Sequence, residues 1–235
     1  MVFQFESDKS ELYKNVRDAS GKTLRPKEIR QFDKEFLAFS AADPSMSVLE
    51  LGCGAGLLLQ YLKHKGFKDV TGIDYDENLT GVLSELDGDG VATEISDAEA
   101  YLDRIQGARV FDRIVIFDVL EHFDLDSSVR ILSKVRSVLA EGGKVLIRVP
   151  NSTSPWGLRM QFGTFDHVTM FSPGRLYELA KITGFEATAM AGHTIGKRRK
   201  VFFERLLHGI LSRILTYHPE IWEAALVCIY EKTER

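Results

Sequence analysis

Short apolar runs alternate with longer amphipathic stretches over residues 48–150. This alternation is typical of βαβ units, in which buried parallel strands are connected by helices. The pattern predicts five strands in this region and two more near the end of the chain, and hence a doubly wound, mostly parallel α/β sheet. The predicted strands are residues 47–51, 70–74, 91–95, 111–117, 144–149, 185–191 and 224–231.

Helical periodicity is clearest in two intervals between the predicted strands. One helix is expected to begin near Asp126, because apolar residues then recur at three- and four-residue steps, and to end at Gly142-Gly143. Another begins with Ser172 as its N-cap and Pro173 at the first helical position. Helices on both faces of the sheet give a three-layer α/β/α arrangement.

The residues before the first strand form a separate N-terminal extension. A helix is predicted over residues 22–40, before Asp43-Pro44-Ser45 breaks the chain. The sequence therefore divides into a helical extension, residues 1–45, and an α/β domain, residues 46–235. Within the domain, residues 197–218 are predicted to form a helical insertion between the last two strands.

Three glycines at alternate positions, Gly52, Gly54 and Gly56, follow the first predicted strand. Glycine lets the backbone turn sharply and lets a ligand approach without a Cβ atom in the way. Glu50 lies in the same apolar strand, where an unpaired carboxylate is costly, so we expect it to have a dedicated hydrogen-bond partner. Asp74 follows the glycine turn by 18 residues, close to the ~20 expected for an acid that bonds ribose hydroxyls. The two acids indicate a nucleoside ligand, whereas the glycines alone also fit a bare strand-to-helix turn.

The glycine spacing distinguishes two kinds of nucleoside site. A dinucleotide fingerprint reads GxGxxG and holds a pyrophosphate, whereas this chain reads GxGxG after an acid and has Leu57 where the third glycine would stand. An acid beside the ligand suits a cation. The motif resembles that of the class I S-adenosylmethionine-dependent methyltransferases, and the likeness extends over most of the chain. The resemblance implies a Rossmann-like fold, S-adenosylmethionine as cofactor and S-adenosylhomocysteine as product.

In that family the glycine loop lies against the amino-acid part of the cofactor. The resemblance places Asp74 on the ribose and Asp97 on the adenine, although Asp97 also fits the role of a helix N-cap. Asp118 follows the fourth strand, at the carboxyl edge where open α/β sheets bind ligands. The predicted cofactor site is Glu50, Gly52, Cys53, Gly54, Gly56, Asp74, Tyr75, Asp97, Ala98 and Asp118.

Three local stretches narrow the resemblance. The chain has Val119-Leu120-Glu121-His122 after the fourth strand, Pro150-Asn151 after the fifth, and Asp166-His167 ahead of Phe171-Ser172-Pro173. These stretches resemble the ubiquinone-biosynthesis-type and polysaccharide-locus methyltransferases. The resemblance favours transfer to oxygen of a small molecule or saccharide.

Methyl transfer requires the nucleophile, the methyl carbon and the sulfur to be aligned, and good orientation can supply ~7–11 kcal/mol of barrier reduction. No metal is required, and none is predicted. An alcohol or phenol acceptor must also lose a proton, for which a histidine is a suitable base. His167 is the favoured base because it lies in the irregular segment that we expect to contact the acceptor, with Asp166 adjacent to it. His122 is the second candidate, and either histidine could instead be structural. The predicted acceptor site, in a segment that could also be a lid over the core, is Asn151, Trp156, Met160, Phe165 and Asp166.

Composition narrows the class of protein. The chain has 235 residues, 44% of them hydrophobic, and a formal net charge of −4, so we expect no nucleic-acid partner. Cys53 and Cys228 form neither a metal motif nor a disulfide framework, and neither a leader segment nor an apolar run near ~18 residues is recognisable. A cytoplasmic protein is expected, either a monomer or a homodimer.

A basic amphipathic segment lies late in the chain. Lys197-Arg198-Arg199-Lys200 precedes apolar residues at helical spacing. These apolar residues could pack against the sheet or a second subunit and leave the charges solvated. Alternatively, residues 197–215 could contact the inner face of a membrane or a lipid-linked acceptor, because each Lys or Arg near an anionic surface contributes ~1 kcal/mol.

The sequence therefore predicts an S-adenosylmethionine-dependent methyltransferase. A non-catalytic domain that binds the cofactor as a sensor or subunit is the alternative, since it would keep Glu50, the glycines and Asp74 but would show no turnover. An NAD-dependent oxidoreductase is disfavoured by the glycine spacing and by the lack of a recognisable Tyr-x-x-x-Lys pair.

Overall fold

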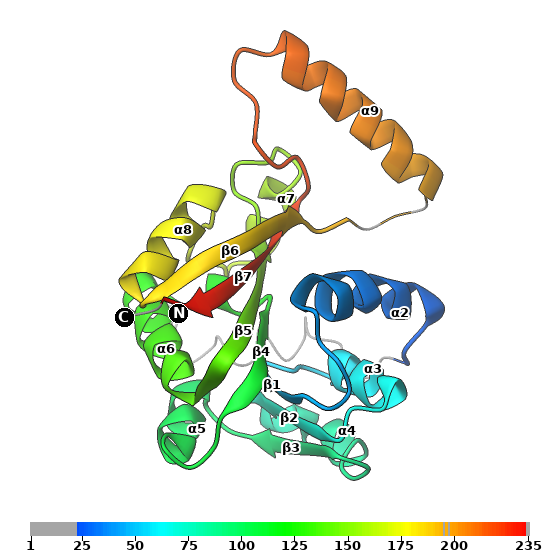
Figure 1. Ribbon diagram of the computed structural model, residues 1–235. Coiled ribbons are helices and arrows are strands. Elements are labelled where there is room, and N and C mark those ends of the chain that lie inside the picture. The colour runs from blue at the N-terminus through cyan, green and yellow to red at the C-terminus, as the bar shows by residue number, and fades with distance from the viewer. Residues whose placement is uncertain (1–22, 195, 197, 234–235) are drawn as a thin grey trace, which may run out of the picture.

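A computed structural model describes residues 23–194, 196 and 198–233. It contains a seven-stranded sheet of order β3-β2-β1-β4-β5-β7-β6, in which β7 runs antiparallel to both of its neighbours (Figure 1). The predicted doubly wound, mostly parallel fold is confirmed. The strands are β1 (Ser47–Leu51), β2 (Asp69–Asp74), β3 (Val91–Ile95), β4 (Phe111–Phe117), β5 (Leu139–Pro150), β6 (Phe185–Gly192) and β7 (Ala225–Lys232).

Helices cover both faces of the sheet, so the core consists of two apolar layers (Figure 1). On one face lie α5 (Ala98–Ile105), α6 (Leu125–Val138) and α8 (Pro173–Ile182). On the other lie α2 (Pro26–Phe32), α3 (Leu57–Lys65) and α4 (Thr80–Ser84). The central strands are buried on both sides, which is why they appear in the sequence as continuous apolar runs.

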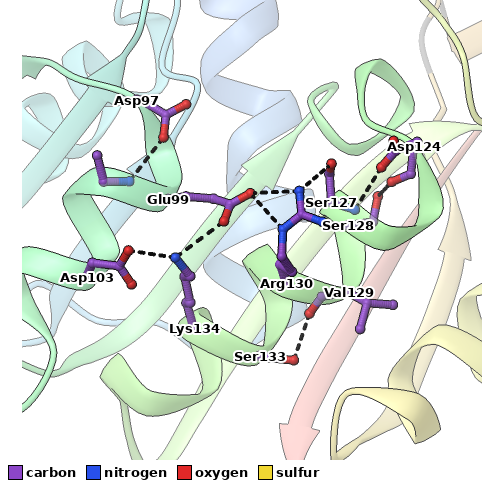
Figure 2. A network of polar contacts seen from close by, with 11 residues as sticks. Asp97, Glu99, Asp103, Asp124, Ser127, Ser128, Val129, Arg130, Ser133 and Lys134 are labelled. Carbon is purple, nitrogen blue, oxygen red and sulfur yellow. Dashed lines mark hydrogen bonds and ion pairs between the residues drawn. The ribbon is translucent and has the colours of Figure 1, made fainter.

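Ion pairs join α5 to α6 along their exposed sides (Figure 2). Lys134 lies 2.7 Å from Asp103 and 3.3 Å from Glu99, and Glu99 also pairs with Arg130 at 3.4 Å. Exposed pairs of this kind contribute little stability individually. The apolar side of α6 makes the larger contribution, because Ile131, Leu132, Val135 and Val138 are buried against the sheet.

The N-terminal helix is less regular than its periodicity predicts. α2 continues into a π-helical segment, Asp33–Ala38, a rare conformation that occurs often near functional sites. Tyr61 of α3 donates a hydrogen bond to Asp33 at 2.8 Å and packs against Phe32, with ring centroids 5.2 Å apart. The helix therefore packs on the α/β domain. The part of the predicted extension in residues 1–22 lies outside the described residues.

Several element ends differ from the predictions, and those of two helices differ clearly. α6 ends at Val138 rather than at the glycine pair, because Leu139 has extended backbone and already pairs with Phe111 of β4. The predicted helical insertion is α9, which ends at Ile214, and it extends away from the rest of the molecule (Figure 1). None of the helices in the described part of the chain is long and apolar enough to span a bilayer.

Candidate functional site

The glycine loop connects β1 to α3 with three left-handed residues. Gly52, Gly54 and Gly56 have φ angles of 72°, 53° and 72°, which favour glycine because a Cβ atom is strained there. A Cβ on Gly52 would also lie 2.4 Å from Val119, whereas a Cβ on Gly54 would meet nothing within 4 Å. The loop thus offers bare backbone at a point where there is space for a ligand.

Asp74 holds the glycine loop from the end of the neighbouring strand. Its carboxylate accepts hydrogen bonds from the backbone amides of Gly54 at 2.8 Å and Asp76 at 3.1 Å. Tyr75, the next residue, is exposed. Cys53 lies in the loop but is buried, and burial raises the pKa of its thiol. Asp74 therefore fixes the loop and holds Gly54 next to its own carboxylate at the carboxyl edge of the sheet.

Contrary to expectation, no described residue supplies a hydrogen-bond partner to the Oε2 atom of the buried acid Glu50. Its side chain is buried in β1. Burial raises the pKa of Glu50 well above its usual value; Arg148 opposes this effect and Asp74 adds to it. A buried polar atom without a partner is costly unless something else satisfies it. The residues therefore fit a ligand with a hydrogen-bond donor or a positive charge at this point.

Asp97 has a structural role that the sequence left open. Its carboxylate accepts a hydrogen bond from the Ala100 amide at 3.0 Å and caps α5, as Figure 2 shows. Ala98 is the first residue of that helix. The cap uses one carboxylate oxygen, so the predicted adenine contact stays a prediction.

Asp118 lies at the end of β4 in a strained conformation, with φ of 56°, which is uncommon for a residue other than glycine. Arg148 of β5 donates from Nε to both of its carboxylate oxygens, at 3.0 and 3.1 Å. The same guanidinium lies 3.4 Å from Glu35 in the π-helical segment, and Glu35 also contacts His193. These charges link the N-terminal helix to the edge of the sheet that carries Asp118.

Two histidines and two acids meet beyond the end of β4. His122 Nδ1 lies 2.9 Å from Asp166 Oδ2, and the rings of His122 and His167 are 4.8 Å apart in an edge-on arrangement. One ligand-type atom from each of Glu121, His122 and His167 lies within 4.8 Å of the others. Backbone amides of residues 168 and 169 donate to the Glu121 carbonyl and join the two loops. The structure thus brings both predicted bases together, but Asp166 pairs with His122 rather than with its neighbour in sequence.

Glu121 should make stability fall with rising pH. Burial raises the pKa of its carboxyl to about 8, and the charge of Asp118 adds to this shift. The folded chain therefore keeps a proton that the unfolded chain releases near its usual pKa of ~4.3, so the free energy of unfolding falls by up to about 1.4 kcal/mol per pH unit between these values. Glu121→Gln should remove this slope when urea unfolding is compared at pH 5 and pH 8. If the unfolding free energies of the variant and the parent change with pH in parallel, Glu121 is not the group responsible for the slope.

The predicted acceptor residues do not form one cluster. Asn151 is buried and donates to the carbonyls of Ile221 and Glu223, so it holds the loop after β5. Trp156 and Met160 line a cavity of about 370 Å³ beneath α9. Phe165 projects into solvent, and Asp166 binds His122. The acceptor role of each stays a prediction.

Three charged or titratable residues at this edge of the sheet were not predicted as site residues from the sequence: Arg148, Glu35 and His193. The argument applied to Glu50 would also have detected Arg148, because this arginine interrupts the apolar run of β5. Glu35 and His193 carry no such signal: both belong to segments whose polarity is ordinary for a surface.

The comparisons with known proteins agree with this architecture. The chain is 27% identical over 158 residues to a ubiquinone biosynthesis O-methyltransferase of Aeromonas salmonicida, with 62% of this chain and 65% of that protein aligned. The match thus spans just under two thirds of that relative's length. A 1,6-didemethyltoxoflavin-N1-methyltransferase of Burkholderia thailandensis, solved with S-adenosylhomocysteine and its acceptor, superposes with a TM-score of 0.61 at 18% identity, over 98% of this chain and 86% of that one.

An S-adenosylmethionine-dependent methyltransferase of Archaeoglobus fulgidus superposes with a TM-score of 0.63 at 20% identity, over 98% of this chain and all of the other. The fold is therefore that of the class I S-adenosylmethionine-dependent methyltransferases. The family model described as a methyltransferase domain matches residues 24–189. The chain belongs to this methyltransferase family, as the glycine motif predicted.

Proposed function

We propose that the protein is an S-adenosylmethionine-dependent methyltransferase that acts on an oxygen of a small molecule or saccharide. The observation that carries the proposal is the buried Oε2 atom of Glu50, which lacks a partner among the described residues beside an open glycine loop. Family membership and the ubiquinone O-methyltransferase relative support the same conclusion.

The cofactor fits the residues at the carboxyl edge of β1 and β2. Glu50 would bond the cationic amino-acid part, and the glycine loop would lie along it. Asp74 accepts two backbone hydrogen bonds, and its remaining oxygen lone pairs would accept hydrogen bonds from the ribose hydroxyls. When bound, S-adenosylmethionine supplies an activated methyl group on a positively charged sulfur. The chain's residues orient the acceptor toward that group and exclude water.

We assign the base to His122, with Asp166 as a positioning residue. A carboxylate 2.9 Å from Nδ1 holds the proton on that nitrogen, so Nε2 carries the basic lone pair. An acceptor hydroxyl would donate its proton there as the methyl group is transferred. His167, the base favoured by sequence, would then support the ring of His122 by edge contact.

The acceptor is proposed to lie between the histidine pair and the cavity beneath α9. Met160 of α7 (Leu158–Gln161) lines the cavity, and Gln161 of the same helix donates to the carbonyl of His167 at 3.3 Å. The cavity also has aromatic and apolar walls from Trp156 and Leu207, which suit an acceptor with an apolar or lipid-linked part. A cytoplasmic location belongs to the same proposal.

Glu50→Gln should weaken cofactor binding by about 10- to 100-fold, because a hydrogen bond to a charged group contributes roughly 1.5–3 kcal/mol. Calorimetric titration with S-adenosylmethionine and S-adenosylhomocysteine measures the effect. Glu94→Gln is the matched control, since it makes the same change in an exposed acid of β3 that pairs with Arg104.

Unchanged affinity in Glu50→Gln would overturn the assignment of this acid, and binding of NAD by the parent protein would overturn the class of ligand. Cofactor binding without methyl transfer to any of a panel of phenols, catechols and saccharides would favour the non-catalytic alternative. Methyl transfer to a nitrogen in such a panel would correct the acceptor atom alone.

A further inference from the structure

Helix α9, Arg198–Ile214, is amphipathic but buries none of residues 199–214. It stands away from the α/β domain, and residues 215–224 connect it to β7 without a helix or strand (Figure 1). In a surface helix of a globular protein the apolar side normally faces the core. The position of α9 therefore keeps its apolar side out of the core of the domain.

The contacts of His208 fix which side of α9 faces the domain. Trp156 donates a hydrogen bond to His208 at 3.1 Å, and the Trp222 ring stacks on His208 with centroids 4.8 Å apart. Trp222 also donates to Ser212, one turn further along, at 2.8 Å. The cavity of about 370 Å³ lies on this side and is lined by Val201, among others. Thus the inward side of α9 is polar at its contacts and only loosely packed.

The opposite side of α9 is apolar and exposed. Phe203, Leu206, Ile210 and Ile214 recur at steps of three and four residues, which places them on one side of a helix, and their exposed fractions lie between 47% and 69%. Phe202 widens this strip and is also exposed. We call these five residues the outward face of α9. A contiguous apolar face of this kind marks an interaction site.

The charged side chains of α9 indicate which kind of surface the outward face binds. Exposed Arg199, Lys200 and Arg213 border it, whereas Glu204, the single acid within the helix, and Arg205 line the cavity on the inward side. The helix is thus cationic on a chain whose formal net charge is −4. A second copy would bring two cationic helices together, which like-charge repulsion disfavours. An anionic surface with an apolar interior complements both the charges and the apolar strip.

We propose that α9 is an interfacial helix that binds a bilayer containing anionic lipids through its outward face. The apolar side chains enter the boundary between headgroups and acyl chains, and the three cations contact the headgroups. His208, held between Trp156 and Trp222, keeps this face directed away from the domain. The cavity beneath α9 thereby lies close to the lipid surface. This inference concerns the helix itself and does not depend on the methyltransferase activity.

Flotation of the full chain with vesicles tests the proposal. Binding is expected to vesicles of phosphatidylcholine with about 30% phosphatidylglycerol at low salt, with little binding to pure phosphatidylcholine and strong weakening in salt near 0.5 M, where the Debye length is only a few Å. Replacing Arg199, Lys200 and Arg213 together by Gln should lower the affinity by about 100-fold, at about fivefold for each cation removed.

A second variant separates the apolar part from the charges. Phe203→Ser with Ile210→Ser should lose vesicle binding without any change in charge. Val110→Ser with Ile182→Ser is the matched control, because these residues are also apolar, are 53% and 63% exposed, and lie elsewhere on the surface. All four side chains are exposed, so unchanged circular dichroism is expected in both variants.

Vesicle binding that persists in Phe203→Ser with Ile210→Ser, or that disappears equally in the control, would overturn the proposal. So would an absence of binding to the anionic vesicles at low salt. A dimer in light scattering that this serine variant dissociates, together with no vesicle binding, would assign the face to a second copy of the chain instead.

Discussion

Replacing His122 with alanine is expected to lower turnover by about 10²- to 10⁴-fold, the usual contribution of a general base. The physical reason is the proposed role of its pairing with Asp166: with Nδ1 2.9 Å from that carboxylate, Nε2 would be the nitrogen that accepts the proton. The measurement is transfer of a labelled methyl group to the best acceptor of a panel of phenols, catechols and saccharides. Affinity for S-adenosylhomocysteine should change little, because Glu50, the glycine loop and Asp74, which are proposed to hold the cofactor, lie in or directly after β1 and at the end of β2.

His167→Ala is the matched control for this prediction. If His122 is the base, turnover in the control should fall by less than about 10-fold. Asp166→Asn should have an intermediate effect, because it no longer fixes the tautomer of His122 but leaves the imidazole in place. The reverse order would assign the base to His167, as the sequence favoured. If turnover instead requires a divalent cation and is lost in EDTA, then Glu121, His122 and His167 bind a metal ion. That result would contradict the assignment of His122 as the base.

The sequence predicts the strands well for a physical reason. Strands β1, β3 and β4 have the predicted bounds. For β1 and β4 the reason is that central parallel strands covered on both faces appear as mostly apolar runs. β5 begins at Leu139, five residues before its predicted start. There the glycine pair was interpreted as a helix end, although it lies inside an extended segment that pairs with β4. Local composition cannot distinguish these cases, since glycine is compatible with both.

The two parts of the candidate site differ in what the sequence can predict. The glycine loop and Asp74 lie within 25 residues and at the ends of neighbouring strands, so motif spacing was enough to associate them. The pairing of His122 with Asp166 and that of Arg148 with Glu35 join residues far apart in the chain. They depend on how loops and the N-terminal helix pack after the sheet forms. Tertiary packing of that kind leaves no periodic signal.

Arg148→Met is expected to cost about 3–5 kcal/mol of unfolding free energy, because removal of one partner from a buried ion pair leaves an uncompensated charge. The Arg148 side chain is only 15% exposed and lies between Asp118 and Glu35. Its guanidinium also lies 4.5 Å from the centre of the Phe117 ring. Urea unfolding followed by circular dichroism measures the loss. Methionine retains most of the side-chain volume, so the effect reports the charge rather than a cavity.

Arg104→Met makes the same change in an exposed pair, where the arginine side chain is 56% exposed and binds Glu94. It should cost no more than about 1 kcal/mol. Because Glu35 lies in the π-helical segment, Arg148→Met should also loosen the N-terminal helix and increase hydrogen exchange in residues 26–38. Equal losses in the two arginine variants would mean that the charges linking Asp118, Arg148 and Glu35 do not hold that helix to the sheet. Contacts such as that between Phe32 and Tyr61 would then fix it instead.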